Sequence, residues 1–119
     1  MKLIQKTKFK REQRKKRVRA KIFGTGARPR LSVFRSNSHV YAQLIDDTKN
    51  ATLAASTDLG LKEALKKSLM EKARLVGIDL AAKAKTKNIQ KVVFDRGRFT
   101  YKGAVAALAQ KVREEGIKF

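Results

Sequence analysis

Cysteine is absent from this sequence, and histidine occurs once, as His39. Without cysteine the chain has no disulfide framework, no thiolate nucleophile and no cysteine-based zinc site, and one histidine cannot form a histidine cluster for a metal. The longest apolar runs, such as residues 105–109, are much shorter than the roughly 20 residues that span a bilayer. The basic N-terminus is not followed by the apolar stretch of a signal peptide. We therefore expect a cytoplasmic protein with no metal, no cofactor, no small-molecule substrate and no contact with a membrane.

Acidic side chains are also scarce. The 119 residues include 30 Lys and Arg but only 10 Asp and Glu, which gives a formal net charge of +20. The length suits one domain, and self-repulsion at this charge destabilises a compact fold unless a polyanion relieves it. The composition therefore predicts a nucleic acid as the partner.

The positive charge is unevenly distributed. Residues 1–30 contain 13 basic residues and one acidic residue, a net charge of +12. We predict a basic arm over residues 1–23 and a globular domain over residues 24–119. Residues 11–21 contain no Gly or Pro, but their only apolar side chains are Val18 and Ala20, too few to offset the entropy of ordering. We expect the arm to be disordered alone and helical on RNA. A solvated tail or a localisation signal is the alternative. The candidate RNA-binding residues of the arm are Lys8, Lys10, Arg11, Arg14, Lys15, Lys16, Arg17, Arg19 and Lys21.

The globular part begins with a pattern of strands. Apolar and polar residues alternate near residues 31–36, 39–46 and 52–57, with turn residues between them, as in an antiparallel meander. The alternation places Leu31 and Val33 on one face of the sheet, and Ser32 and Phe34 on the other.

Helical spacing follows. Ser68 and Glu71 form a capping box for a helix to about residue 85, in which Gly77 would let the helix lie close on the sheet. Residues 91–95 are continuously apolar at their centre, as in a strand buried on both faces and parallel to another. A last helix over residues 102–115 would end at Gly116. The prediction is an α/β fold in βββαβα order, with a mixed sheet in two or three layers.

Two segments of this domain combine cations, hydroxyls, amides and rings. Such groups match the phosphates, 2′-hydroxyls and exposed bases of folded RNA. The first segment, a predicted hairpin, contributes Arg35, Ser36, Asn37, His39, Tyr41 and Gln43. The second, between the last strand and the last helix, contributes Arg96, Arg98 and Lys102. Arg28 and Arg30, on either side of Pro29, could reach neighbouring phosphates. The alternative is that Tyr41 is a core residue and that the polar residues of the hairpin only form its turn.

Other site types fit less well. Gly24 and Gly26 lack the third glycine and the following helix of a nucleotide loop, so we interpret them as a flexible hinge. A metal-dependent nuclease would need converging carboxylates, for example Asp46, Asp79 and Asp95. Asp46 stands at a turn, and Asp95 precedes Arg96, with which it could form a local ion pair. We therefore predict no catalytic residue.

The segments that carry these candidates resemble a known family. Residues 24–47 read G-T-G-A-R-P-R-L-S-V-F-R-S-N-S-H-V-Y-A-Q-L-I-D-D, and together with residues 92–97 and 101–119 they closely resemble the bacterial-type large ribosomal subunit protein eighteen family. The resemblance covers essentially the whole chain. It implies a ribonuclease-H-like mixed sheet without the nuclease's carboxylates, and binding of 5S ribosomal RNA at the central protuberance. The implied neighbours are 23S ribosomal RNA and large-subunit ribosomal protein five.

The resemblance also implies which residues face RNA. They are Arg28, Arg30, Arg35, Ser36, Asn37, His39, Tyr41, Gln43, Arg96, Gly97 and Tyr101. The sequence departs from the family pattern at Arg98, Lys102 and Ala104, where Gly, His and Arg are usual, so individual contacts there are not implied. The alternative functions are a general nucleic-acid chaperone and, less favoured, a metal-dependent nuclease.

Overall fold

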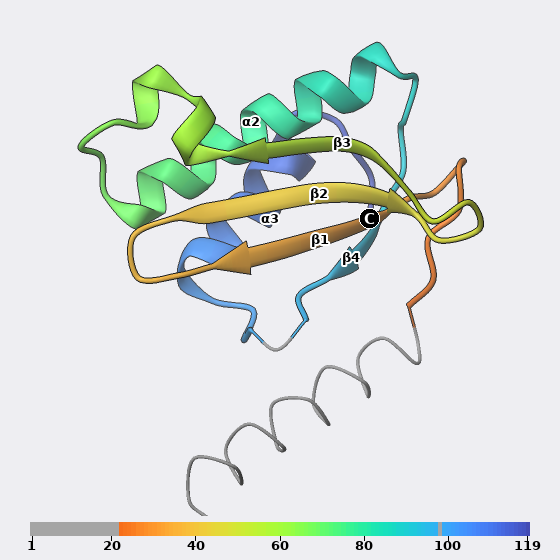
Figure 1. Ribbon diagram of the computed structural model, residues 1–119, viewed down its shortest axis with the longest axis horizontal. Coiled ribbons are helices and arrows are strands. Elements are labelled where there is room, and N and C mark those ends of the chain that lie inside the picture. Colours follow the sequence, from red (N-terminus) through yellow and green to blue (C-terminus); the bar gives the residue numbers. More distant parts are fainter. Residues whose placement is uncertain (1–21, 98) are drawn as a thin grey trace, which may run out of the picture.

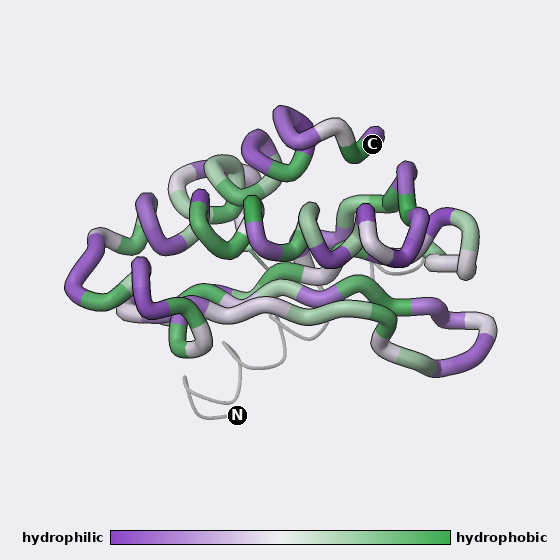
Figure 2. The backbone as a smooth tube through the Cα atoms, turned by 90° about the horizontal axis from the view of Figure 1, so that it is seen from above, coloured by the Kyte–Doolittle hydropathy of each residue, from purple (hydrophilic) through white to green (hydrophobic). Residues whose placement is uncertain are grey.

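A four-stranded sheet with two helices on one of its faces forms the body of the protein (Figure 1). The computed structural model describes residues 22–97 and 99–119. Both helices lie in one layer and the sheet in a second, as Figure 2 shows edge-on. The predicted mixed α/β fold is therefore confirmed, in two layers. The predicted basic arm lies almost wholly outside the described residues, as does Arg98, and the ribonuclease-H-like class stays a prediction.

In chain order the elements are β1 (Arg30–Arg35), β2 (Val40–Asp46), β3 (Ala51–Thr57), the 3-10 turns η1 (Asp58–Gly60) and η2 (Lys62–Ala64), α2 (Leu69–Thr86), β4 (Val93–Asp95) and α3 (Gly103–Glu114).

The strands lie in the order β3-β2-β1-β4. β1, β2 and β3 pair antiparallel through short turns, whereas β4 pairs parallel with β1 after the crossover through α2, as a parallel pair requires. The expectation of a parallel last strand is confirmed. The expectation that it is buried on both faces is wrong: β4 is a short edge strand in which Val93 and Phe94 are half-buried, because the helices cover only one face.

Alternation along the strands divides the sheet into two faces, as predicted. Leu31, Val33 and Leu44 are buried beneath the helices. On the opposite face, which we call the open sheet face, the register places Phe34 beside Tyr41 and Ser32 beside Gln43. Side chains of neighbouring strands in register lie on the same face, so these four residues form one surface.

The Ser68 hydroxyl accepts a hydrogen bond from the backbone N–H of Glu71 (3.3 Å) at the start of α2, as the capping box predicts.

The two helices pack closely against each other at Gly77. A Cβ at Gly77 would lie 2.9 Å from the carbonyl oxygen of Leu108 in α3. The absent side chain therefore allows close approach to α3, and not to the sheet as the sequence suggested.

Candidate nucleic-acid interface

The open sheet face carries exposed aromatic rings. Phe34 is 50% exposed and Tyr41 is 37% exposed, and the Tyr41 hydroxyl donates a hydrogen bond to Gln43 Oε1 (3.4 Å). Phe99, from the loop after β4, packs edge-on against Phe34 with ring centroids 5.6 Å apart. Exposed rings beside amide and hydroxyl groups provide the stacking surface that unpaired bases use. Tyr41 and Gln43 were predicted for this surface. Phe34 was missed, although a Phe on the polar side of a strand is itself a signal.

The tip of the β1–β2 hairpin, residues 36–39, is exposed and locally ordered. Ser36 Oγ accepts a hydrogen bond from the backbone N–H of His39 (3.1 Å), and Ser36 N–H donates to the His39 carbonyl (2.9 Å). Asn37 is exposed beyond these bonds, and Arg35, at the end of β1, is half-buried. Ser36, Asn37 and His39 are therefore presented together at one end of the sheet, whereas Arg35 is in register with buried Val40 and lies on the side of the helices.

A buried carboxylate holds this hairpin against α2. Asp58 is only 4% exposed; its Oδ2 lies 2.8 Å from His39 Nδ1 and 3.6 Å from Lys72 Nζ, and its Oδ1 accepts from the backbone N–H of Val40 (2.8 Å). Lys72 also donates to the Ser38 carbonyl (2.7 Å). Burial raises the pKa of Asp58, but the bonds from His39 and Val40, with the charge of Lys72, outweigh it and lower that pKa overall. This pairing was not predicted, because 19 residues separate His39 from Asp58 and no sequence pattern joins them.

Because the pKa of Asp58 is lowered in the folded protein, the stability that its carboxylate contributes depends on pH. An unfolded Asp titrates near pH 3.9, so the ionised carboxylate stabilises the fold above about pH 4 and this contribution is lost as the pH falls through the lower folded pKa. We expect the difference in the free energy of unfolding between the unchanged chain and Asp58→Asn to shrink below about pH 4. Urea unfolding between pH 5 and pH 2.5 measures it. A difference that stays constant over that range would contradict the assignment.

Arg30 lies inside the protein and joins three segments. Its Nε and Nη2 donate to the two carboxylate oxygens of Asp47 (both 3.0 Å), and its Nη1 donates to Asp95 Oδ2 (2.7 Å). Asp47 Oδ2 also accepts from the backbone N–H of Gly24 (2.8 Å). Arg30 is only 8% exposed. Its guanidinium is therefore not presented to a phosphate, contrary to the prediction from the sequence. Arg28, the other arginine of that prediction, is exposed. The ion-pair partner shown for Asp95 is Arg30, where the sequence suggested Arg96.

The same network corrects the hinge prediction at Gly24. This glycine is buried against β1, and a Cβ there would lie 2.4 Å from the backbone nitrogen of Arg30 and 2.6 Å from the carbonyl oxygen of Ile45. Gly24 is therefore required by close packing of the backbone, and the segment enters the sheet in a fixed position.

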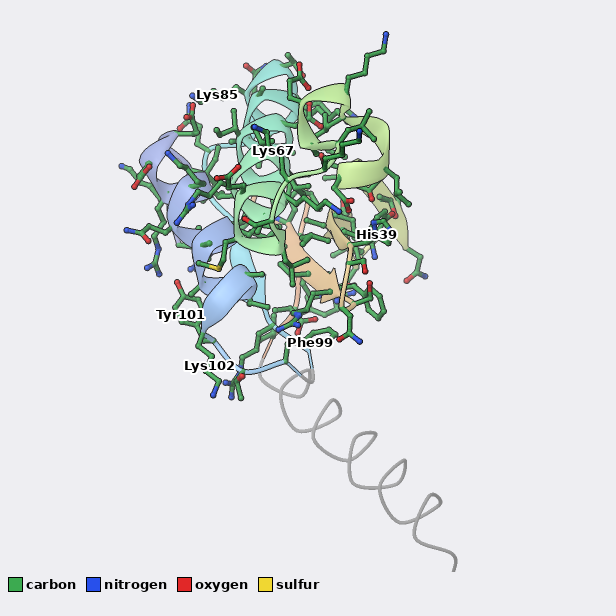
Figure 3. The ribbon with its side chains drawn as sticks, turned by 90° about the vertical axis from the view of Figure 1, so that its left-hand side faces the viewer. His39, Lys67, Lys85, Phe99, Tyr101 and Lys102 are labelled. Carbon is green, nitrogen blue, oxygen red and sulfur yellow. The ribbon has the colours of Figure 1, made fainter. Side chains whose placement is uncertain are left out.

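The loop between β4 and α3 carries further candidates. Phe99, Tyr101 and Lys102 lie at one end of the molecule (Figure 3). Tyr101 is 44% exposed and contacts Phe94 edge-on, with centroids 5.5 Å apart. Gly97, at φ +61°, donates its N–H to Asp95 Oδ1 (2.8 Å). Of the predicted RNA-binding residues that the structure describes in this loop, Arg96, Tyr101 and Lys102 are exposed.

The three acidic residues considered for a nuclease have separate partners. Asp46 accepts hydrogen bonds from the backbone and hydroxyl of Thr48, which help to lower its pKa. Asp79 lies 3.0 Å from Lys83 Nζ, and Asp95 pairs with Arg30. Among residues 22–97 and 99–119 no group of three His, Cys, Asp or Glu side chains could hold a metal ion. In the same residues, no helix has the length and apolar character needed to cross a membrane.

Comparison with known proteins identifies the relatives of this chain. Residues 5–119 match the family described as ribosomal L18 of archaea, bacteria, mitochondria and chloroplast. A protein of Chloroherpeton thalassium, named large ribosomal subunit protein uL18, is 53% identical over 117 residues, which cover 96% of this chain and 98% of that protein. The protein of the same name from Pseudothermotoga lettingae is 51% identical over 115 residues, 94% of either chain. That from Limosilactobacillus reuteri is 53% identical over 109 residues, 92% of either chain.

Proposed function

Because this chain belongs to the ribosomal L18 family, we propose that it binds 5S ribosomal RNA and attaches it to 23S ribosomal RNA at the central protuberance. Membership of the family makes the protein a structural, non-enzymatic component of the large subunit of the cytoplasmic ribosome. To family membership the proposal adds the RNA target, the position of the protein at the central protuberance, and large-subunit ribosomal protein five as its neighbour.

The observation that carries the proposal is the open sheet face. Exposed Phe34 and Tyr41 lie in register next to the polar hairpin tip, and Phe34 contacts Phe99 of the loop that bears Arg96 and Lys102. Aromatic rings flanked by cations and hydrogen-bonding groups suit an RNA whose bases are partly unstacked. The basic arm would supply attraction that does not depend on RNA sequence, while this face fixes the register of the protein on the RNA.

Competition between RNAs tests the choice of target. The full chain is bound to labelled 5S ribosomal RNA at about 150 mM salt, and excess transfer RNA is added. We expect 5S ribosomal RNA to stay bound, because the face recognises a particular RNA shape. Equal displacement by both RNAs would favour a general nucleic-acid chaperone instead.

A sheet-face variant tests the site within the same assay. Base stacking on an aromatic side chain contributes about 1–3 kcal/mol, so Tyr41→Ala should weaken binding to 5S ribosomal RNA by roughly tenfold. Leu59→Ala is the matched control, because Leu59 is 72% exposed and lies outside the open sheet face. Equal effects of the two substitutions would contradict the assignment of the face.

A further inference from the structure

A hollow of about 240 Å³ lies at the outer edge of β3, between this strand, η1 and α2. A water molecule occupies about 30 Å³ in the liquid, so the space holds roughly eight waters, enough for one flat nucleobase but not for a folded oligonucleotide. Tyr41 belongs both to the wall of this hollow and to the open sheet face. A strand of RNA on that face could therefore place one unstacked base into the hollow.

The wall of the hollow contains a buried hydroxyl beside a paired carboxylate. Ser56 is only 4% exposed, and its hydroxyl makes no hydrogen bond of normal geometry within the part of the chain that the structure describes, whereas Asp79 Oδ2 has the Lys83 ammonium as its ion-pair partner. The Ser56 hydroxyl is nevertheless close enough to lower the pKa of Asp79; together with Lys83 it outweighs the opposite effect of burial. Buried polar atoms usually have partners, and a carboxylate can accept more hydrogen bonds than the one that Lys83 supplies, so this pair of side chains leaves room for a ligand in the hollow.

The arrangement of the polar groups in the wall indicates which kind of ligand the hollow would bind. Lys83 Nζ lies 3.0 Å from Asp79 Oδ2 and donates a hydrogen bond to the Ala55 carbonyl (2.8 Å). The hollow thus presents a carboxylate, which accepts hydrogen bonds, directly beside an ammonium, which donates them. Guanine has the complementary edge, since its N1–H and 2-amino donors stand beside the O6 acceptor. Adenine has an unprotonated N1 at the same place, which would face the carboxylate with a lone pair.

We propose that this hollow binds an unstacked guanine of the RNA. Asp79 accepts hydrogen bonds from N1–H and the 2-amino group, Lys83 donates to O6, and Tyr41 provides the ring at the entrance. Recognition of the Watson–Crick edge of a splayed base is a general way in which proteins read RNA. The site rests on the proposed function, because it requires that RNA lie along the open sheet face.

Short RNAs that differ in one base test the guanine site. The full chain is titrated with labelled nonamers of uridine whose central base is guanine, adenine or hypoxanthine, and binding is followed by fluorescence anisotropy. Because a good bidentate contact discriminates by about 5- to 150-fold, we expect the guanine RNA to bind roughly tenfold more tightly than the adenine RNA. The hypoxanthine RNA, which lacks the 2-amino group, should lie between them.

A variant of the carboxylate assigns the preference to the hollow. Asp79→Asn should reduce the ratio of guanine to adenine affinity to about one, and Glu114→Gln, which removes a negative charge from a residue paired with Lys111, should leave the ratio unchanged. If Asp79→Asn does not fold, Lys83→Met serves in its place, with the same expected loss. A preference that survives the substitution, or equal binding of the three RNAs by the unchanged chain, overturns the guanine site. Failure to bind both these RNAs and 5S ribosomal RNA would overturn the proposed function instead.

Discussion

Deletion of residues 1–21 is expected to weaken binding to 5S ribosomal RNA by roughly 10²- to 10³-fold at physiological salt, because phosphate contacts supply a large share of such affinity. The deleted residues contain eleven Lys and Arg and one Glu, a net charge of +10 out of the +20 of the whole chain. If the full chain neutralises about eight phosphates, the slope of log affinity against log salt is about −6 to −7. The truncated chain should give a slope about half as steep.

The same truncation should leave the globular domain folded. Within the part of the chain that the structure describes, the buried apolar core extends from Leu31 to Ile117, so we expect this core to form without the deleted residues. We expect the thermal unfolding temperature of the truncated chain to match that of the full chain. A control chain with residues 2–21 in shuffled order keeps the charge and should keep most of the affinity. Binding by the truncated chain within threefold of the full chain, or a clearly lower unfolding temperature, would contradict this division of roles.

Replacement of Arg30 by Ala should lower the free energy of unfolding by about 3–5 kcal/mol, the usual cost of removing one partner from a buried ion pair. Asp95 is 1% exposed and would lose the guanidinium 2.7 Å away, and Asp47 would lose two hydrogen bonds. Arg30→Lys should restore only part of this stability, because a single ammonium cannot reproduce the planar set of donors of Arg.

Urea unfolding at neutral pH measures these differences. Arg28→Ala is the matched control, since Arg28 is exposed and surface substitutions usually change stability by less than about 0.5 kcal/mol. A loss below about 1 kcal/mol for Arg30→Ala would show that the network around Arg30 contributes little to the fold.

Local patterns were sufficient to predict much of the fold. Side chains alternate between the two faces of any strand, so the sequence alone placed Leu31 on the face opposite Phe34, while it left open whether Tyr41 is a core residue. The start of α2 could be predicted at Ser68, because a capping box involves residues only three apart. The end of α3 was predicted at Gly116, which has φ +100°, since a glycine after a helix readily adopts a positive φ.

By itself the sequence determined the charge, the family resemblance and the two faces of the sheet, because each depends on composition or on residues close together in the chain. The tertiary structure alone decided the roles of Arg30, His39 and Gly77. Arg30 was predicted for the surface but pairs with Asp95, 65 residues away, and Gly77 faces α3. Such contacts depend on how distant elements pack, and a side chain with several possible partners takes the ones that packing brings within hydrogen-bonding distance.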